Sequence, residues 1–493
     1  MYRPTISRPV FSNFTSVIKG KKVAVLGIGI SHQPLVPCLC AWGAKVSIFD
    51  QRLDSEPEIQ KLQHDYAKQG LELEWFLGAD YLEHLVGHDL IFKTPVVHPE
   101  IEPIRRAVEA GAKLTTEMEV FVQYCPAPII GITGSDGKTT TTTLISKALK
   151  NAGYKVHVGG NIGTPLLPEI EQITKDEWVV LELSSFQLLT MRQSPEIAVI
   201  TNITPNHLNV HKDLAEYIEA KHNIMRWQDA QDRVVLNWED ANCRSFAQTS
   251  KAHIVWFDAH LKTDAEREQL AQKIPLNLTV DQPIYSWSKT ENQLYTDANE
   301  PLFSRELIKL PGDYNVANYL ATLACTKEIV EPAVIAALAQ EFGGVEHRVE
   351  LIAEHHGVKF YNSSIDSSPQ RTKATLSAFN SPLILLVGGK DKACDYTGLG
   401  KAIFTKTKRL ILCGENGSLI KANLKQELTT EEFAELKIAE AIDYNEAVDI
   451  ALNWAETGDS VLLSPAGTSF DRFANFMKRG EAFKQAVRDG IKR

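Results

Sequence analysis

The sequence predicts an α/β protein whose domains are each built on a parallel β-sheet. Short apolar runs rich in β-branched residues alternate with helix-like stretches along nearly the whole chain, a pattern typical of parallel α/β domains. Three of these runs end in glycines, at 23–29, 129–138 and 383–390, as strands do where a sheet binds a ligand. At roughly 100–200 residues per domain, the 493 residues predict about three domains.

Two breaks divide the pattern into three segments. The stretch 124–128 contains Pro126 and Pro128, which resist both helix and central strand, so it is predicted to be a linker. A second break falls at Gly343 and Gly344, after the helix-like run 332–340. The predicted domains are therefore 1–125, 126–343 and 344–493. The polar and irregular stretch 245–304 is interpreted as a peripheral elaboration of the middle domain.

Composition narrows the function classes. Hydrophobic residues make up 44% and charged residues 23% of the chain, a mix that excludes a disordered protein. The net charge of −10 disfavours a non-specific nucleic-acid binder, although one cationic pocket is enough to hold an anionic small ligand. Seven cysteines without a CxxC pair fit a reducing compartment. No apolar run approaches the roughly 20 residues that cross a bilayer, and the N-terminus lacks an apolar signal segment. We expect a cytoplasmic protein without membrane or nucleic-acid partners.

The first glycine-ended strand predicts a nucleotide-like ligand. The run 22–26 leads into the pattern GxGxS, and glycines let a backbone approach a phosphate at a helix N-terminus. The next strand, 45–49, ends at Asp50, which is expected to bond a ribose hydroxyl. A dinucleotide dehydrogenase is disfavoured, because the third glycine is missing and Pro37 falls inside the following helix. A tight turn without a ligand remains the alternative.

The second glycine-ended strand predicts a triphosphate site. A strand enters the motif GSDGKT and a helix, expected over 140–151, leaves it. Backbone N–H groups of the glycine turn would bind phosphate oxygens, Lys138 would neutralise the β- and γ-phosphates, and the Thr139 hydroxyl would contact Mg²⁺. The strict GxxxxGK[ST] pattern fails, because Ile132 stands where its first glycine belongs.

Polar side chains follow other strands of the middle segment. Asn161 lies in a glycine turn, Glu182 ends an apolar strand, and His207 follows the strand near 197–201. A carboxylate and an imidazole at strand ends that face a nucleotide would suit a magnesium site. Taken singly, Glu182 is equally well a paired or capping acid, and His207 an ordinary loop histidine.

The segment after His207 has two further features. His207 and His211 are four residues apart, but their surroundings indicate a loop, so a zinc site is disfavoured. Asp213 and Glu216 have the spacing of a capping box, which predicts a helix up to residue 225. Lys221 lies on this helix, and its spacing alone makes it an ordinary surface lysine.

These motifs together resemble the Mur ligase family of peptidoglycan synthesis. The resemblance rests on GSDGKTTTT, GGNIG, LELSSFQL, NITPNHL, EAKHNI and LLSPAGTSFDRFANFMKRG, and it covers nearly the whole chain, with the weakest fit at 245–304. It implies a Rossmann-like UDP-binding domain, a central P-loop ATPase-type parallel sheet, and a C-terminal Rossmann-like domain that brings the amino acid.

The implied activity is the ATP-dependent addition of D-glutamate to UDP-N-acetylmuramoyl-L-alanine through an acyl phosphate. A related amide ligase that uses another amino acid, such as L-glutamate, is the alternative. A folylpolyglutamate synthetase is disfavoured, because it has no need of a UDP-binding domain. A nucleotide-regulated binding protein without turnover is disfavoured, because the chain carries the family's full catalytic set: Lys138, Glu182, His207, Lys221 and Arg348.

The resemblance also implies the roles of individual residues. The UDP-substrate would contact Gly29, Ile30, Ser31, Asp50, Gln51, Arg52, Asn161, Ser184, Ser185 and Gln187. ATP would contact Gly134, Ser135, Asp136, Gly137, Lys138, Thr139, Thr140, Asn315, Asn318 and Arg348. Two Mg²⁺ ions would be held by Thr139, Glu182, His207 and Lys221, the last open to carbamylation. D-glutamate would contact Ser367, Lys392, Ser469 and Phe476. The expected enzyme is a monomer.

The sequence departs from the family pattern at several positions. Tyr314 stands where the family usually has His, and Ser363 and Ile365 stand where Asp and Lys are usual. Asn206 and Asn209 flank His207 where acids are common. The changes at 363 and 365 bear most directly on the C-terminal contacts, and so on the identity of the amino acid.

Overall fold

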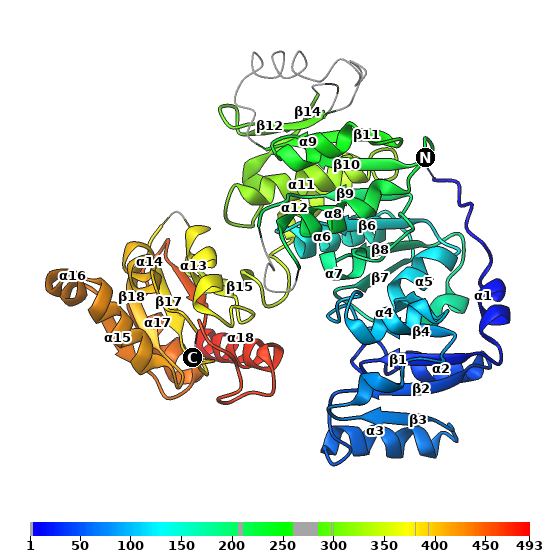
Figure 1. The fold of residues 1–493 in the computed structure, drawn as a ribbon. Coiled ribbons are helices and arrows are strands. Elements are labelled where there is room, and N and C mark those ends of the chain that lie inside the picture. The colour runs from blue at the N-terminus through cyan, green and yellow to red at the C-terminus, as the bar shows by residue number, and fades with distance from the viewer. Residues whose placement is uncertain are drawn as a thin grey trace. The chain divides into compact units, whose positions relative to one another are not determined.

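The predicted α/β class is confirmed. A computed structural model describes residues 3–205, 211–259, 284–296, 298, 300–379, 381–392 and 394–493. Its strands form three sheets of five, nine and six strands, and the chain divides into two compact units (Figure 1). Unit 1 comprises Met1–Arg305 and Ala317–Leu338, and unit 2 comprises Glu306–Val316 and Ala339–Arg493. Among the described residues, no helix combines the length and apolar character needed to span a membrane.

The first sheet of unit 1 is parallel, in the order β3-β2-β1-β4-β5. Its strands are β1 (Lys22–Leu26), β2 (Lys45–Asp50), β3 (Glu74–Leu77), β4 (Leu90–Lys93) and β5 (Lys113–Thr115). Its helices are α1 (Phe11–Ile18), α2 (Leu35–Ala41), α3 (Pro57–Lys68), η1 (Tyr81–His84), α4 (Glu102–Glu109) and α5 (Glu117–Tyr124). The strand order reverses at β1, so the glycine loop after β1 lies at the point where such sheets bind ligands. Pro37 is tolerated because it lies in the first turn of α2.

The second sheet of unit 1 has the order β14-β13-β12-β11-β10-β9-β6-β8-β7, in which β13 runs antiparallel to both of its neighbours and the other described pairs are parallel. Its strands are β6 (Ile129–Thr133), β7 (Val156–Gly160), β8 (Trp178–Glu182), β9 (Ile197–Ile200), β10 (Arg233–Asn237), β11 (His253–Asp258), β12 (Ile284–Ser288), β13 (Gln293–Tyr295) and β14 (Pro301–Ser304). The described part of 245–304 thus extends one edge of this sheet, as a peripheral elaboration would; residues 260–283 lie outside the described residues.

Helices and short turns connect these strands and follow them. They are α6 (Lys138–Asn151), η2 (Leu167–Gln172), α7 (Ser185–Leu188), α8 (Leu214–Arg226), α9 (Ala241–Ala247), η3 (Arg305–Leu307), α11 (Tyr314–Cys325) and α12 (Pro332–Glu341). The capping box predicted for α8 is half formed: the Asp213 carboxylate accepts a hydrogen bond from Glu216 N at 2.8 Å, but Glu216 Oε2 accepts from Lys212 N at 3.0 Å rather than from Asp213 N.

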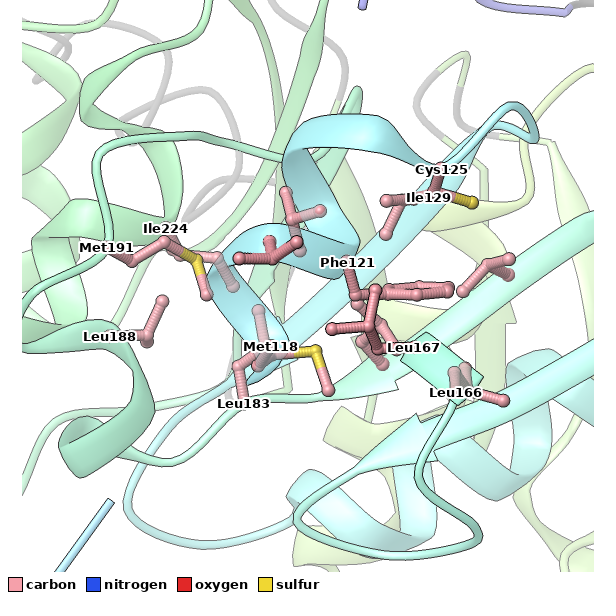
Figure 2. Packing of buried hydrophobic residues seen from close by; sticks show 14 of the residues in the cluster. Met118, Phe121, Cys125, Ile129, Leu166, Leu167, Leu183, Leu188, Met191 and Ile224 are labelled. Atoms are coloured by element: carbon pink, nitrogen blue, oxygen red, sulfur yellow. The ribbon is translucent and has the colours of Figure 1, made fainter. Parts of the chain in front are cut away.

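One buried cluster joins the two sheets of unit 1. Helix α5 supplies Met118 and Phe121 to this cluster, which also contains Phe92 of the first sheet and Leu181 of the second. Figure 2 shows Met118 and Phe121 among apolar side chains of the second sheet and its connections, such as Ile129 in β6 and Leu183 directly after β8. The proline-containing stretch 125–128 then runs without helix or strand to β6, as its prolines predicted. The Arg8 guanidinium donates to Cys125 O at 2.8 Å and so anchors this stretch.

Unit 2 contains the third sheet, in the order β15-β16-β20-β17-β18-β19, with β15 antiparallel to its neighbour. Its strands are β15 (Glu350–His355), β16 (Val358–Asn362), β17 (Leu383–Val387), β18 (Thr407–Leu412), β19 (Lys437–Glu440) and β20 (Ser460–Leu463). Its helices are α13 (Pro369–Ser377), α14 (Leu399–Lys406), α15 (Gly417–Glu427), α16 (Thr430–Glu435), α17 (Tyr444–Trp454) and α18 (Phe476–Lys492). The strand expected at 383–387 is β17, and it is buried along its whole length.

Candidate functional site

The carboxyl ends of β6, β8 and β9 bring the predicted phosphate site together. The three strands are parallel neighbours, with Ile132 paired to Glu182 and Thr133 paired to Ile200. Because parallel strands end at the same edge, the glycine turn after β6, the Glu182 side chain and the segment after β9 meet there. The sheet, and not the chain order, makes these residues neighbours.

The glycine turn is shaped to bind an anion. Gly134 and Gly137 have φ values of +149° and +80°, and Gly137 is the N-cap of α6. A Cβ at Gly134 would overlap the Thr201 hydroxyl oxygen, so no larger residue fits there without movement. The first backbone N–H groups of α6 point out of the helix end and favour negative charge. The predicted phosphate loop therefore has the geometry that its motif requires.

The segment after β9 braces this loop. Asn202 Oδ1 accepts a hydrogen bond from Asp136 N at 2.9 Å, and the Thr201 hydroxyl donates to Asp136 O at 2.6 Å. Ser135 Oγ accepts from Thr204 N at 2.8 Å. The motif did not reveal Thr201 and Asn202 as supports of the phosphate loop. Polar residues directly after an apolar strand were the available signal.

Two lysines converge on one carbonyl of the loop. Lys138 Nζ donates to Gly134 O at 2.8 Å, and Lys221 Nζ donates to the same oxygen at 2.6 Å. Lys221 is 2% exposed, so its interpretation as an ordinary surface lysine is wrong. Burial, and then the positive charge of Lys138, lower the pKa of Lys221 well below its usual value. The neutral amine of Lys221 is therefore more accessible than that of an exposed lysine.

Glu182 has the environment of a metal ligand rather than of a fully paired acid. The residue is 1% exposed, and its Oε1 accepts a hydrogen bond from Asn161 Nδ2 at 2.8 Å. Its Oε2 is buried and has no hydrogen-bond partner among the described residues. A buried carboxylate oxygen without a donor favours a cation beside it. His207, the other predicted ligand in this region, lies outside the described residues.

Three of the residues predicted to contact the UDP-substrate lie at the start of or within α7: Ser184, Ser185 and Gln187. Ser184 and Gln187 cap each other: Ser184 N donates to Gln187 Oε1 at 3.0 Å, and Gln187 N donates to Ser184 Oγ at 3.3 Å. Ser185 Oγ lies 2.9 Å from His211 Nε2, and His211 Nδ1 lies 3.2 Å from Glu216 Oε2. The sequence reasoning did not link His211 to Ser185, because their contact joins residues 26 positions apart.

The residues predicted for the uridine nucleotide follow the adjacent strands β1 and β2. Asp50 accepts hydrogen bonds from Ile28 N at 2.8 Å and from Arg52 Nε at 2.9 Å. Burial raises the pKa of Asp50, but the hydrogen bonds from Arg52 and Ile28 outweigh burial and lower it below the usual value. In this structure Asp50 locks the glycine loop to Arg52, a role that the expected ribose contact did not include. Ile30, at the tip of the loop, is 84% exposed.

Asn315 and Asn318, which are predicted to contact ATP, both lie on helix α11, and the boundary between the two compact units falls between them. Asn318 belongs to unit 1, where its Oδ1 accepts a hydrogen bond from Thr141 Oγ1 of α6 at 3.2 Å. Asn315 belongs to unit 2, where its side chain donates to Pro311 O at 2.7 Å. Asn318 therefore lies beside the helix that begins at the phosphate loop.

Unit 2 gathers the residues predicted for D-glutamate at one edge of its sheet. Ser367, Lys392 and Ser469 follow the parallel neighbours β16, β17 and β20, and Phe476 begins α18. A bridge between Lys390 and Thr468 joins the two loops that carry Lys392 and Ser469.

Arg348 lies in a turn that is contacted by Ser363 and Ile365, two of the residues that depart from the family pattern. Ser363 Oγ accepts a hydrogen bond from Val349 N at 3.3 Å, and Ile365 N donates to His347 O at 3.1 Å. The Ile365 contact uses only the backbone, so it does not depend on the side chain. Tyr314, the third departure, is about half exposed.

Comparisons with known proteins agree with this geometry. Residues 132–326 match the Mur ligase middle domain, and residues 347–467 match the glutamate ligase domain of Mur ligases. A UDP-N-acetylmuramoylalanine–D-glutamate ligase of Ruminiclostridium cellulolyticum is 44% identical over 96% of this chain and 98% of its own. The chain belongs to the Mur ligase family. Ligases of the same name from Clostridium botulinum are 42% identical to this family member over 97% of the chain. Because Mur ligases are ATP-dependent, this member uses ATP.

Solved structures of Mur ligases share the fold. The UDP-N-acetylmuramate-alanine ligase of Thermotoga maritima superposes with a TM-score of 0.52 at 19% identity, covering 95% of this chain and 99% of its own. A UDP-N-acetylmuramoyl-L-alanyl-D-glutamate–2,6-diaminopimelate ligase gives a TM-score of 0.53 at 18% identity, covering 97% and 93%. At these identities the likeness concerns the three-domain Mur ligase fold alone.

Proposed function

We propose that this Mur ligase catalyses the ATP-dependent addition of D-glutamate to UDP-N-acetylmuramoyl-L-alanine, a step of peptidoglycan precursor synthesis. The observation that carries the proposal is the 44% identity, over nearly the whole length of both chains, to a ligase named for this reaction. The phosphate loop at the carboxyl ends of β6, β8 and β9 supplies the matching chemistry. The expected division into 1–125, 126–343 and 344–493, and a monomeric cytoplasmic enzyme, belong to the same proposal.

The chemistry begins with transfer of the γ-phosphoryl group of ATP to the alanyl carboxylate. The helix N-terminus after Gly137 and the Lys138 ammonium would bind the phosphates and stabilise charge on the transferred group. Glu182, with its unpartnered Oε2, and the Thr139 hydroxyl at the start of α6 would hold Mg²⁺. That ion supplies charge neutralisation at the phosphoryl oxygens.

The amine of D-glutamate then attacks the acyl phosphate, forming the amide and releasing phosphate. Lys392 would pair with a carboxylate of D-glutamate, and the hydroxyls of Ser367 and Ser469 would orient it, with Phe476 beside them. Arg348 would bring its positive charge to the ATP phosphates. The UDP part of the substrate would occupy the loops after β1 and β2.

Lys221 is proposed to act as a carbamate. Carbamylation requires a neutral amine that attacks CO₂, and burial lowers the pKa of Lys221, which makes that form more accessible. The product is an anion, which suits a second Mg²⁺ better than an ammonium would. His207 remains the predicted partner ligand of that ion.

Phosphate release from ATP tests the proposed function. Purified protein is assayed with UDP-N-acetylmuramoyl-L-alanine and a panel of D- and L-amino acids. Release is expected only with ATP, the UDP-substrate and D-glutamate together. A preference for L-glutamate would identify the alternative amide ligase, and equal release without either co-substrate would contradict ligase activity.

A further inference from the structure

The backbone is strained on both sides of Arg348. His347 has a φ of +65° and Val349 has a φ of +44°, and a β-branched residue rarely adopts the left-handed region. Arg348 N donates to Val345 O at 2.9 Å, which closes a tight turn. Strained conformations of this kind persist only where the surrounding structure holds them. The turn from Val345 to Glu350, called the arginine turn below, must therefore be held from outside.

A single buried ammonium holds both ends of the arginine turn. Lys484, on α18, is 6% exposed. Its Nζ lies 2.6 Å from Glu346 Oε1 and 2.9 Å from Glu350 Oε1, and these residues flank the strained positions. A third carboxylate oxygen, Glu481 Oε1 of the same helix, lies 3.2 Å away. Glu350 Oε2 in turn accepts a hydrogen bond from His347 N at 2.9 Å.

Helix α18 also approaches the arginine turn at a glycine. A Cβ at Gly480 would overlap His347 Nδ1 and would lie 2.5 Å from Ser364 Oγ. The same ring nitrogen, His347 Nδ1, lies 3.1 Å from Asn362 Nδ2. The helix therefore limits the turn by contact at Gly480 and binds it by charge at Lys484.

We propose that Lys484 is a positioning residue, which holds the arginine turn in the strained conformation that presents Arg348 to the reacting phosphates. The inference rests on the proposed function, which gives Arg348 its role. Without the ammonium, the turn relaxes and Arg348 spreads over conformations that are not productive, so its charge reaches the transition state less often. Glu346, His347 and Glu481 are also near enough to one another for a metal ion, but the Lys484 ammonium already neutralises the two acids.

The test compares Lys484→Met with Lys484→Arg in the full-length enzyme. The methionine variant should lose about tenfold in kcat, while KM for the UDP-substrate stays at the wild-type value. The arginine variant keeps the charge and should recover most of the rate. Lys492→Met, which removes an exposed charge from the same helix, should match the wild type. Hydrogen exchange at the His347 and Arg348 amides should be faster in Lys484→Met only.

A double-mutant cycle separates positioning from general damage. If Lys484 acts through Arg348, adding Lys484→Met to Arg348→Ala causes no further loss of kcat. Multiplied losses would overturn the proposal, as would unchanged turnover of Lys484→Met beside a slow Arg348→Ala. Wild-type turnover of Arg348→Ala would instead overturn the proposed role of Arg348. Gly480→Ala, which displaces His347 without changing charge, should slow kcat in the same way.

Discussion

Replacing Glu182 by glutamine should stabilise the protein and remove most of its activity. The substitution keeps the shape of the side chain and an oxygen for Asn161 Nδ2, but it removes the negative charge. In the structure Glu182 Oε2 is buried without a hydrogen-bond partner among the described residues, a state that costs about 1–3 kcal/mol. A neutral amide is cheaper to bury than a carboxylate. We therefore expect Glu182→Gln to raise the free energy of unfolding by about 1 kcal/mol in the absence of Mg²⁺.

The same change removes a charge that the reaction needs. Loss of a magnesium ligand at the transferred phosphoryl group should lower kcat by about 10³-fold, which corresponds to about 4 kcal/mol of transition-state stabilisation. Turnover is measured by phosphate release, and stability by thermal unfolding with and without Mg²⁺ and a non-hydrolysable ATP analogue. The melting temperature should rise by about 1–2 °C without ligands. Mg²⁺ should add less protection to the variant than to the wild type.

Glu177 provides a matched control for this experiment. Like Glu182 it is buried, but its oxygens lie 2.8 Å from Lys155 Nζ and 2.6 Å from His157 Nε2. Glu177→Gln should destabilise the protein and leave kcat unchanged, the reverse of the result at Glu182. If Glu182→Gln lowered stability and kept the wild-type rate, Glu182 would be a structural acid and the metal assignment would fail.

Three other predictions concern single side chains. Lys138→Ala should lower kcat by at least about 10²-fold in the phosphate-release assay, because a cation at the phosphates is lost. A wild-type rate would show that this loop does not bind the ATP phosphates. Lys221→Ala should be nearly inactive, and a short carboxylic acid should restore part of the rate by replacing the carbamate. Burial raises the pKa of Glu117 from 4.5 to about 7, so the folded state binds the proton more tightly than the unfolded state. Its contribution to stability is full below pH 4.5 and is lost as the pH rises to about 7, so Glu117→Gln should flatten the melting temperature between those values.

Local patterns predicted the elements of the fold well. The strand 383–387 and the N-cap at Asp213 are present as expected, and the predicted linker 124–128 is irregular from residue 125 onward, because each depends on neighbouring residues alone. The turn and helix start of the phosphate loop could also be predicted, since its glycines, its lysine and the start of α6 are contiguous in the sequence. Sheet order was not predicted, because strand pairing joins residues far apart in the sequence.

The environments of the site residues were harder to predict than their positions. Lys221 was interpreted as exposed, yet Tyr217 and Ile224, four residues before and three after it, place it on the buried face of α8. The helical spacing of these apolar residues was visible in the sequence, but a lysine is usually exposed, so the residue type led to the wrong prediction. The pairing of His211 with Ser185 and Glu216 left no such trace, because it depends on how α7 and α8 pack.

The residues that sequence rules misjudge are those that the proposed reaction uses. Lys221 is buried with a lowered pKa, and Glu182 is buried with an unpartnered oxygen among the described residues; both environments reduce the stability of the fold. Lys221 contacts the phosphate loop at Gly134 O, and Glu182 ends the neighbouring strand β8. Unit 1 buries other ionisable groups as well: Lys93 is fully buried, and burial raises the pKa of Glu117 to about 7. Unlike Lys93 and Glu117, Lys221 and Glu182 lie beside the phosphate loop, where the proposed function places ATP and Mg²⁺. The turn at Arg348 in unit 2 is a comparable case, in which strained backbone conformations at His347 and Val349, rather than a buried charge, reduce the stability of the fold.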